Sequence, residues 1–228
     1  MESLFKILLI LHIAGGAIGL LTGTINLIRR KGDKFHRRAG KVFVYAMMAA
    51  GFSSLALAAI HPNYFLFIVG IFTIYLVATG SRYLHLKMLG STQRPALLDW
   101  IIIGGMVVAG LLFIGLGASL LFDKNNFGVV VIVFGALGLR LVRTDFSNYN
   151  GKSKVKNYWL LAHLQRMTGA YIASATAFLV VNAKYSPVAL PSALVWLMPT
   201  VVLTPLILLW SRKNKVEKRE FAAEKIET

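Results

Sequence analysis

Seven long apolar segments, separated by short polar connections, constrain the fold of this 228-residue chain more than any other feature. A helix needs roughly 20 apolar residues to cross the hydrocarbon core of a bilayer, and each segment comes close to that length. We therefore predict an all-α, polytopic membrane bundle of seven transmembrane helices. Their approximate bounds are 4–28, 42–60, 64–84, 97–121, 127–141, 158–181 and 194–210.

Composition supports this class. The chain is 57% hydrophobic and only 15% charged, and its mean hydropathy is +0.66. Soluble domains are about a quarter charged. The fifth segment is the shortest, because about 15 helical residues rise only about 22 Å. We expect it to span the core if Arg140 and Arg143 extend to the interface.

Lysine and arginine are concentrated in alternate connections. Of the 25 basic residues, 21 belong to the first, third and fifth connections and to the C-terminal end, which share one side if seven helices alternate. The positive-inside rule then predicts an external N-terminus and a cytoplasmic C-terminus. We expect a membrane domain over 1–211 and a mixed-charge tail over 212–228. The net charge of +16 is thus explained by an anionic inner leaflet as partner, and no nucleic-acid partner is expected.

The chain contains no cysteine, which excludes disulfides, iron–sulfur clusters and covalent c-type haem. It also lacks HExxH, a metal-binding carboxylate cluster, a Ser–His–Asp arrangement and a phosphate-binding glycine loop. We therefore expect no metal site of these kinds. A membrane enzyme acting on lipid or quinone ranks below the hypotheses given below.

Glycine recurs at intervals of four residues in the first segment, at Gly15, Gly19 and Gly23, and is also frequent in segment 97–121. Small residues at this spacing let helix backbones approach closely. We predict close packing within the bundle, and oligomerisation through the glycine-rich helices is left open. The alternative is that these glycines clear space for a flat cofactor or substrate.

His163 and Arg166 lie three residues apart in the sixth segment and therefore share one face of a helix. Ionisable groups at membrane depth are costly and suggest function. Asp99 lies at the start of the fourth segment, and Arg140 and Asp145 close the fifth helix, so these groups occupy the same cytoplasmic layer. We predict that Arg166 faces the interior and reaches Asp99 or Asp145. A purely structural ion-pair network is the alternative.

His12 belongs to the external half of the first segment. Its depth differs from that of His163 by about 10 Å if both helices run straight across a core of roughly 30 Å. We therefore do not expect these two imidazoles to bind one metal ion together. His12 stays a separate candidate for a ligand or proton site.

Three blocks, LHIAGGAIGLLTG (11–23), HRRAGKVFVYAM (36–47) and HLQRMTGAYIASATAFLVVN (163–182), resemble a family of bacterial membrane proteins catalogued only as a domain of unknown function. The resemblance runs from about residue 8 to residue 210. It implies a multi-pass protein of the bacterial cytoplasmic membrane but supplies no reaction. By position, it implies that His12, His36, Gly40, His163, Arg166 and Gly169 belong to the family pattern.

Two functional hypotheses follow. In the first, the protein binds or transports a small molecule or protons. His163 would exchange protons or hold a ligand, Arg166 and Arg140 would hold an anionic or carbonyl group, and Asp99 or Asp145 would orient them. A bundle that serves only as an assembly subunit is a further alternative.

In the second hypothesis, the protein is a b-type haem redox protein. The axial ligands would be His163 with His85 or His36, and basic residues such as Arg82 would pair with the propionates. The similarity to b-type cytochromes lies only in residue type.

Overall fold

The computed structural model describes residues 2–185 and 191–216, and this part of the chain is helical. It contains seven α-helices and one short 3-10 turn. Their bounds are α1 Glu2–Ile28, α2 Lys34–Ile60, α3 Tyr64–Tyr83, α4 Leu97–Phe122, α5 Phe127–Tyr149, α6 Tyr158–Asn182, η1 Ala183–Tyr185 and α7 Ser192–Asn214. Most of the predicted tail, from residue 217 onward, lies outside the described residues.

Six of these helices, α1 to α5 and α7, are long and apolar enough to cross a membrane. The helix that does not meet this criterion is α6, whose first half contains His163, Gln165 and Arg166. The predicted all-helical membrane architecture is confirmed at this level.

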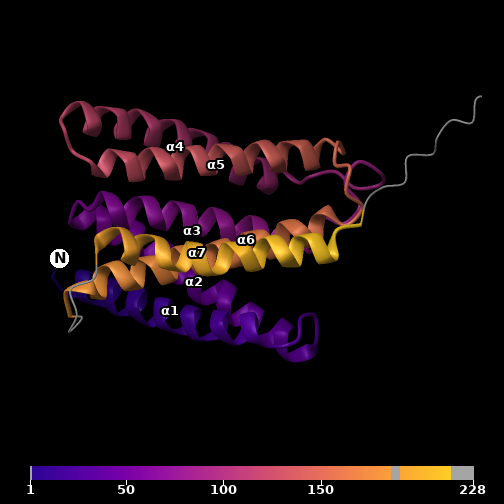
Figure 1. Cartoon of the computed structure of the whole chain (residues 1–228), viewed down its shortest axis with the longest axis horizontal. Helices are drawn as coiled ribbons and strands as arrows, with labels where there is room; N and C mark the ends of the chain where they lie inside the picture. The colour runs from indigo at the N-terminus through magenta and orange to yellow at the C-terminus, as the bar shows by residue number, and fades with distance from the viewer. Residues whose placement is uncertain (1, 186–190, 217–228) are drawn as a thin grey trace, which may run out of the picture.

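The helices run side by side in an elongated bundle (Figure 1). One hairpin, α1–α2, forms one edge, and a second hairpin, α4–α5, forms the other. Between them, α3 contacts α2, α4, α5 and α6, while α6 contacts α1, α3 and α7. The helix that does not meet the spanning criterion therefore lies among other helices.

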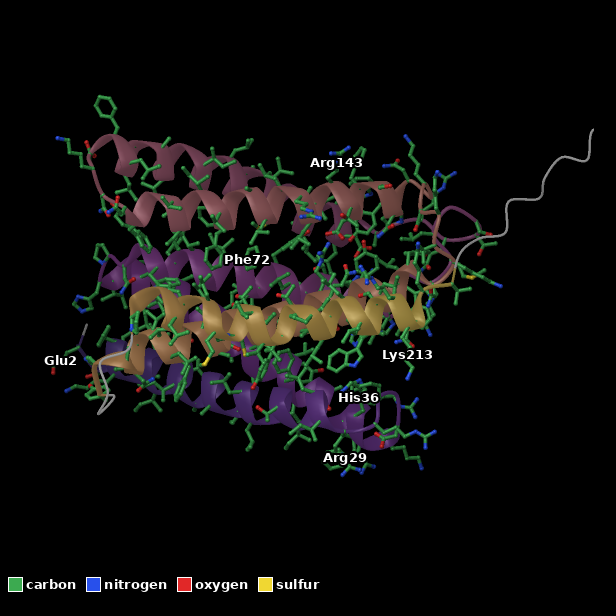
Figure 2. All side chains as sticks on the ribbon, in the orientation of Figure 1. Glu2, Arg29, His36, Phe72, Arg143 and Lys213 are labelled. Atoms are coloured by element: carbon green, nitrogen blue, oxygen red, sulfur yellow. The ribbon has the colours of Figure 1, made fainter. Side chains whose placement is uncertain are left out.

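Charged side chains are divided between the two ends of the bundle. Figure 2 shows Arg29, His36, Arg143 and Lys213 toward one end and Glu2 at the other. The connections α1–α2, α3–α4 and α5–α6 all lie at the basic end in Figure 1. The alternation of basic connections in the sequence thus becomes a separation in space.

Two helix bounds differ from the apolar segments. Instead of ending near residue 141, α5 continues to Tyr149, and its 23 residues rise about 34 Å, enough to span the core. The start of α2 is at Lys34, ahead of the predicted residue 42, because Asp33 caps it by accepting a hydrogen bond from the His36 backbone N–H at 2.6 Å. Polar residues thus extend both helices beyond their apolar segments.

The α4–α5 hairpin meets the rest of the bundle mainly at α3. Phe72 of α3 packs edge-to-face on Phe134 of α5, with ring centroids 5.1 Å apart. Toward the end opposite the basic connections, a surface groove of about 450 Å³ separates α3 from α4, and Phe67, Val108 and Leu112 are among its apolar lining residues. The hairpin is therefore packed less tightly against α3 than its two helices are against each other.

The glycine stripe of α1 packs against α2, as predicted. Gly15, Gly19 and Gly23 are the buried residues of α1. A Cβ at Gly15 would lie only 2.8 Å from the Ala46 carbonyl oxygen, whereas a Cβ at Gly16 would have nothing within 4 Å. Close contact of the two backbones therefore requires glycine at position 15 and not at position 16.

We predict that Gly15→Leu lowers the stability of the detergent-purified protein, because the new side chain forces α1 away from α2. Overpacking of this kind costs about 1–3 kcal/mol. Gly16→Leu is the matched control and should leave the thermal unfolding midpoint close to that of the parent. Equal midpoints for the two variants would contradict the packing described here.

Candidate functional site

A cluster of buried polar side chains joins α3, α5 and α6 at the basic end. Asp145 is 0% exposed and Arg166 is 1% exposed, and Arg166 Nη2 donates to Asp145 Oδ1 at 2.5 Å. The Tyr75 hydroxyl donates to Asp145 Oδ2, and the Tyr83 hydroxyl donates to Oδ1 at 2.7 Å. Asn148 Nδ2 in turn donates to the Tyr83 hydroxyl at 3.0 Å. Asp145 thus accepts hydrogen bonds from two other helices.

Gly80 allows α3 and α6 to cross at this point. A Cβ on Gly80 would lie 2.8 Å from Arg166 Cβ and 3.0 Å from Met167 Cε. The same close crossing brings the Gly80 carbonyl oxygen within 2.9 Å of His163 Nδ1. One glycine therefore helps to position both polar residues of α6.

The guanidinium of Arg166 is only partly satisfied. Its Nη2 also donates to the Leu141 carbonyl at 3.1 Å, and its Cζ lies 5.6 Å from the centroid of the Tyr75 ring. Its Nε is buried and has no hydrogen-bond partner among the described residues. An unsatisfied buried donor costs about 1–3 kcal/mol. The cluster therefore keeps one donor available for an acceptor.

A second ion pair lies between α3 and α4. Arg82 Nε and Nη2 donate to the two carboxylate oxygens of Asp99 at 2.7 and 2.9 Å, a two-point geometry that strengthens the pair. Asp99 is 0% exposed and also accepts the Ala96 backbone N–H at 2.8 Å. Asp99 therefore fixes the start of α4 against α3, and Arg166 pairs with Asp145.

The histidines occupy separate places. His12 Nδ1 is 2.9 Å from the Ala50 carbonyl oxygen, so His12 contacts α2. His36 Nδ1 is buried and has no hydrogen-bond partner among the residues that the structure describes. His85 is exposed just after α3. Of the three candidate haem ligands, His36 and His163 lie on α2 and α6, and His85 follows the end of α3.

The predicted site residues therefore divide into several groups. Arg166 and Asp145 meet, Asp99 belongs to the neighbouring pair with Arg82, and Arg140 is exposed on α5. Among the described residues, no group of three or more His, Cys, Asp or Glu side chains could hold a metal ion.

Sequence reasoning missed the residues that complete the cluster. Tyr75 and Tyr83 lie in an apolar segment, where a tyrosine is usually interpreted as a packing residue or as an anchor at the membrane interface. Asn148 is three residues from Asp145 on α5, and this spacing was a usable signal once the helix was known to continue.

Comparison with known families identifies part of the chain. Residues 9–93 match a family described as predicted membrane protein (DUF2306). The predicted resemblance to a membrane family of unknown function is confirmed over this region, which includes His12, His36, Arg82 and Tyr83. Comparison with curated proteins and with solved structures gives no significant match.

We predict that Asp145→Ala destabilises the protein severely, because it leaves Arg166 buried without its counter-charge. Breaking such a pair costs about 3–5 kcal/mol. Arg143→Ala removes an exposed charge from the same helix and should stay within about 0.5 kcal/mol of the parent. Thermal unfolding in detergent measures both variants. The double variant Asp145→Leu, Arg166→Met should recover most of the loss, and similar midpoints for the two single variants would refute the ion pair.

Proposed function

We propose that all seven helices cross a bacterial cytoplasmic membrane, with the N-terminus outside and the C-terminus in the cytoplasm. Two observations support this topology. Because α6 is flanked by α1, α3 and α7, its polar first half can face protein in place of lipid. The basic connections gather at one end, as the positive-inside rule requires of the cytoplasmic side. Residues 1–211 would then form the membrane domain and 212–228 a cytoplasmic tail.

Reporter fusions test this topology. A green fluorescent protein fused after Thr228 should fluoresce, and alkaline phosphatase at the same place should be inactive. Alkaline phosphatase inserted at Lys124, in the α4–α5 connection, should be active because that connection would be external. Active phosphatase at the C-terminus would overturn the proposal.

We propose that the protein binds or transports a small molecule or protons at the Asp145–Arg166 cluster. The observation that carries this proposal is Arg166 Nε, a buried donor that has no partner in the described part of the chain and lies beside a buried carboxylate. A carboxylate, phosphate or carbonyl oxygen of a ligand, or a water molecule that relays protons, would supply the missing acceptor. His163 lies one turn away on α6, and imidazole is the side chain most easily switched near neutral pH.

Proton uptake at Asp145 would act on the α4–α5 hairpin. A neutral Asp145 no longer attracts the Arg166 guanidinium. The hairpin would then be held at the basic end chiefly by Arg82 and Asp99 and by apolar contacts with α3. Small changes of this kind can become rigid-body movements of packed elements. In this proposal, protonation of Asp145 therefore leads to movement of the α4–α5 hairpin.

A flux measurement in proteoliposomes tests whether the protein transports protons. Liposomes that contain purified protein and an internal pH-sensitive dye should acidify or alkalinise when a potassium diffusion potential is imposed. Asp145→Asn should reduce this flux to the level of empty liposomes, because an amide cannot exchange the proton. Arg143→Gln is the matched control and should retain the flux.

A separate measurement tests whether the protein binds a small molecule. Mass spectrometry of the purified protein should find a bound molecule with a carboxylate, phosphate or carbonyl group, and Arg166→Gln should lose it while Arg143→Gln keeps it. If the parent shows neither proton flux nor a bound molecule, the cluster is a structural ion pair and the proposal is wrong.

A b-type haem redox protein is the second candidate function. It is supported by the placement of His36, in the first turn of α2, and His163, in the first half of α6, because both helices begin at the basic end of the bundle. Two imidazoles from separate helices are the usual axial ligands of b-type haem in membrane bundles.

A further inference from the structure

The α3–α4 connection, residues 84–96, is folded onto the basic end of the bundle. Two of its side chains, Leu86 and Leu89, are only 1% and 5% exposed. They belong to one apolar cluster with the aromatic rings of Tyr83, Tyr149 and Tyr158. The ring centroid of Tyr83 lies 6.2 Å from that of Tyr149 and 6.4 Å from that of Tyr158. The connection therefore packs with a layer of three tyrosines.

This tyrosine layer lies between the Asp145–Arg166 cluster and the basic end. On α5, Tyr149 is four residues beyond Asp145 and so about 6 Å nearer that end. On α6, Tyr158 is eight residues before Arg166 and so about 12 Å nearer it. The hydroxyl of Tyr83 reaches inward to Asp145. A solute that approached the buried carboxylate from the basic end would therefore meet the α3–α4 connection first.

Hydrogen bonds within the connection make it a stiff loop. Gln93 Nε2 donates to the His85 carbonyl oxygen at 2.7 Å, and Gln93 Oε1 accepts the Met88 backbone N–H at 3.1 Å. The Gln93 backbone N–H also donates to the Met88 carbonyl oxygen at 3.1 Å. Gly90, with a φ of +75°, forms the turn between them. Residues 85–93 can therefore move as one unit.

One hydroxyl group attaches this loop to the start of α6. The Tyr158 hydroxyl donates to the Leu86 carbonyl oxygen at 2.6 Å and accepts the Leu89 backbone N–H at 2.8 Å. The ammonium group of Lys87 also lies 4.7 Å from the centroid of the Trp159 ring. The loop is thus stiff within itself but is held to α6 by a small number of polar contacts.

A contact between two glycines attaches the loop to the α5–α6 connection. A Cβ on Gly90 would lie only 2.4 Å from the Cα of Gly151, so the two backbones touch. Because glycines meet here, no side chains interlock, and the two connections can separate without repacking. A stiff loop with separable contacts has the properties of a flap.

We propose that residues 84–96 form a flap that controls access from the cytoplasm to Asp145, and that it opens when its contacts with Tyr158 and Gly151 break. This inference rests on the proposed function of the Asp145–Arg166 cluster. The Arg82–Asp99 pair, which flanks the flap on α3 and α4, would hold its two ends in place. Because the flap leads directly into α4, its opening would accompany movement of the α4–α5 hairpin.

The accessibility of a single thiol tests the flap, since the chain contains no cysteine of its own. Thr79 is 0% exposed and lies one turn from both Tyr75 and Tyr83 on α3. Full-length protein with Thr79→Cys, purified in detergent, is treated with the anionic reagent sulfonatoethyl methanethiosulfonate, and mass spectrometry follows the labelling with time. This thiol should react slowly, whereas Arg143→Cys, at an exposed position, should react rapidly.

Two variants should open the flap. Tyr158→Phe removes two hydrogen bonds, each of which contributes a factor of several to an equilibrium, and should raise the labelling rate of Thr79→Cys about tenfold. Gly90→Ala should also raise it, because the new Cβ meets Gly151. Gly32→Ala is the matched control: Gly32 has a similar φ of +86°, but its Cβ would have nothing within 4 Å, so the rate should not change.

A second reporter distinguishes opening of the flap from general loosening of the fold. Ser54 is 2% exposed on α2, and Ser54→Cys should stay slow to label when Tyr158→Phe is added. Three results would overturn the flap. They are equal rates for Thr79→Cys and Arg143→Cys in the parent, unchanged rates in both opening variants, or faster labelling at Ser54→Cys.

Labelling measures access to the cluster and not transport. Absence of proton flux and of a bound molecule would refute the proposed function and would leave the labelling rates as they are. Unchanged labelling in the opening variants would refute the flap whether or not the protein transports protons. The two failures are therefore distinguishable.

Discussion

A guanidinium carried into an apolar medium has to be neutralised within the protein, and the arrangement of this bundle follows from that requirement. The effective cost of burying an ion is several kcal/mol, and it is offset only by a well-placed counter-charge with further hydrogen bonds. Arg166 receives Asp145 from α5, and the tyrosines of α3 satisfy the rest of that carboxylate. Three helices must therefore meet at one point. This places α6, which does not meet the hydropathy criterion for a membrane span, among other helices.

The two ion pairs of the α4–α5 hairpin are both at the basic end. Asp99 lies at the start of α4 and Asp145 near the end of α5, so the two carboxylates attach the open end of the hairpin to α3 and α6. Toward the closed end the contacts are apolar, and a groove intervenes between α3 and α4. Polar interactions thus determine the position of the hairpin at one end, and side-chain shape determines it at the other. The two ends of the hairpin are therefore attached to the bundle by different kinds of interaction.

Much of this could be predicted from the sequence, for identifiable reasons. Seven apolar segments predicted seven helices, and the spacing of Gly15, Gly19 and Gly23 predicted close packing of α1 within the bundle, though not that its partner is α2. The cost of a buried cation predicted an acidic partner for Arg166. The choice between Asp99 and Asp145 could not be made, because it depends on Arg82 occupying both oxygens of Asp99.

Other features depend on information that hydropathy does not contain. An apolar segment indicates where lipid surrounds a helix, whereas backbone hydrogen bonding continues through polar residues beyond it. For that reason α5 was predicted too short, and the relation between Asp145 and Asn148 was not seen. The roles of Tyr75 and Tyr83 depend on a crossing of α3 and α6 at Gly80, which is a tertiary feature.

The groove between α3 and α4 has a consequence for the protein's surroundings. Its lining residues are almost entirely apolar and it lies along helices long enough to cross a bilayer, so in a membrane acyl chains would fill it. The tilt of α4 is then partly a property of the lipid. Shorter or more disordered chains would let the closed end of the hairpin lean inward, and the rigid helices would transmit that tilt to the carboxylates at the opposite end. Bilayer thickness would therefore act on the strength of a salt bridge that no lipid touches.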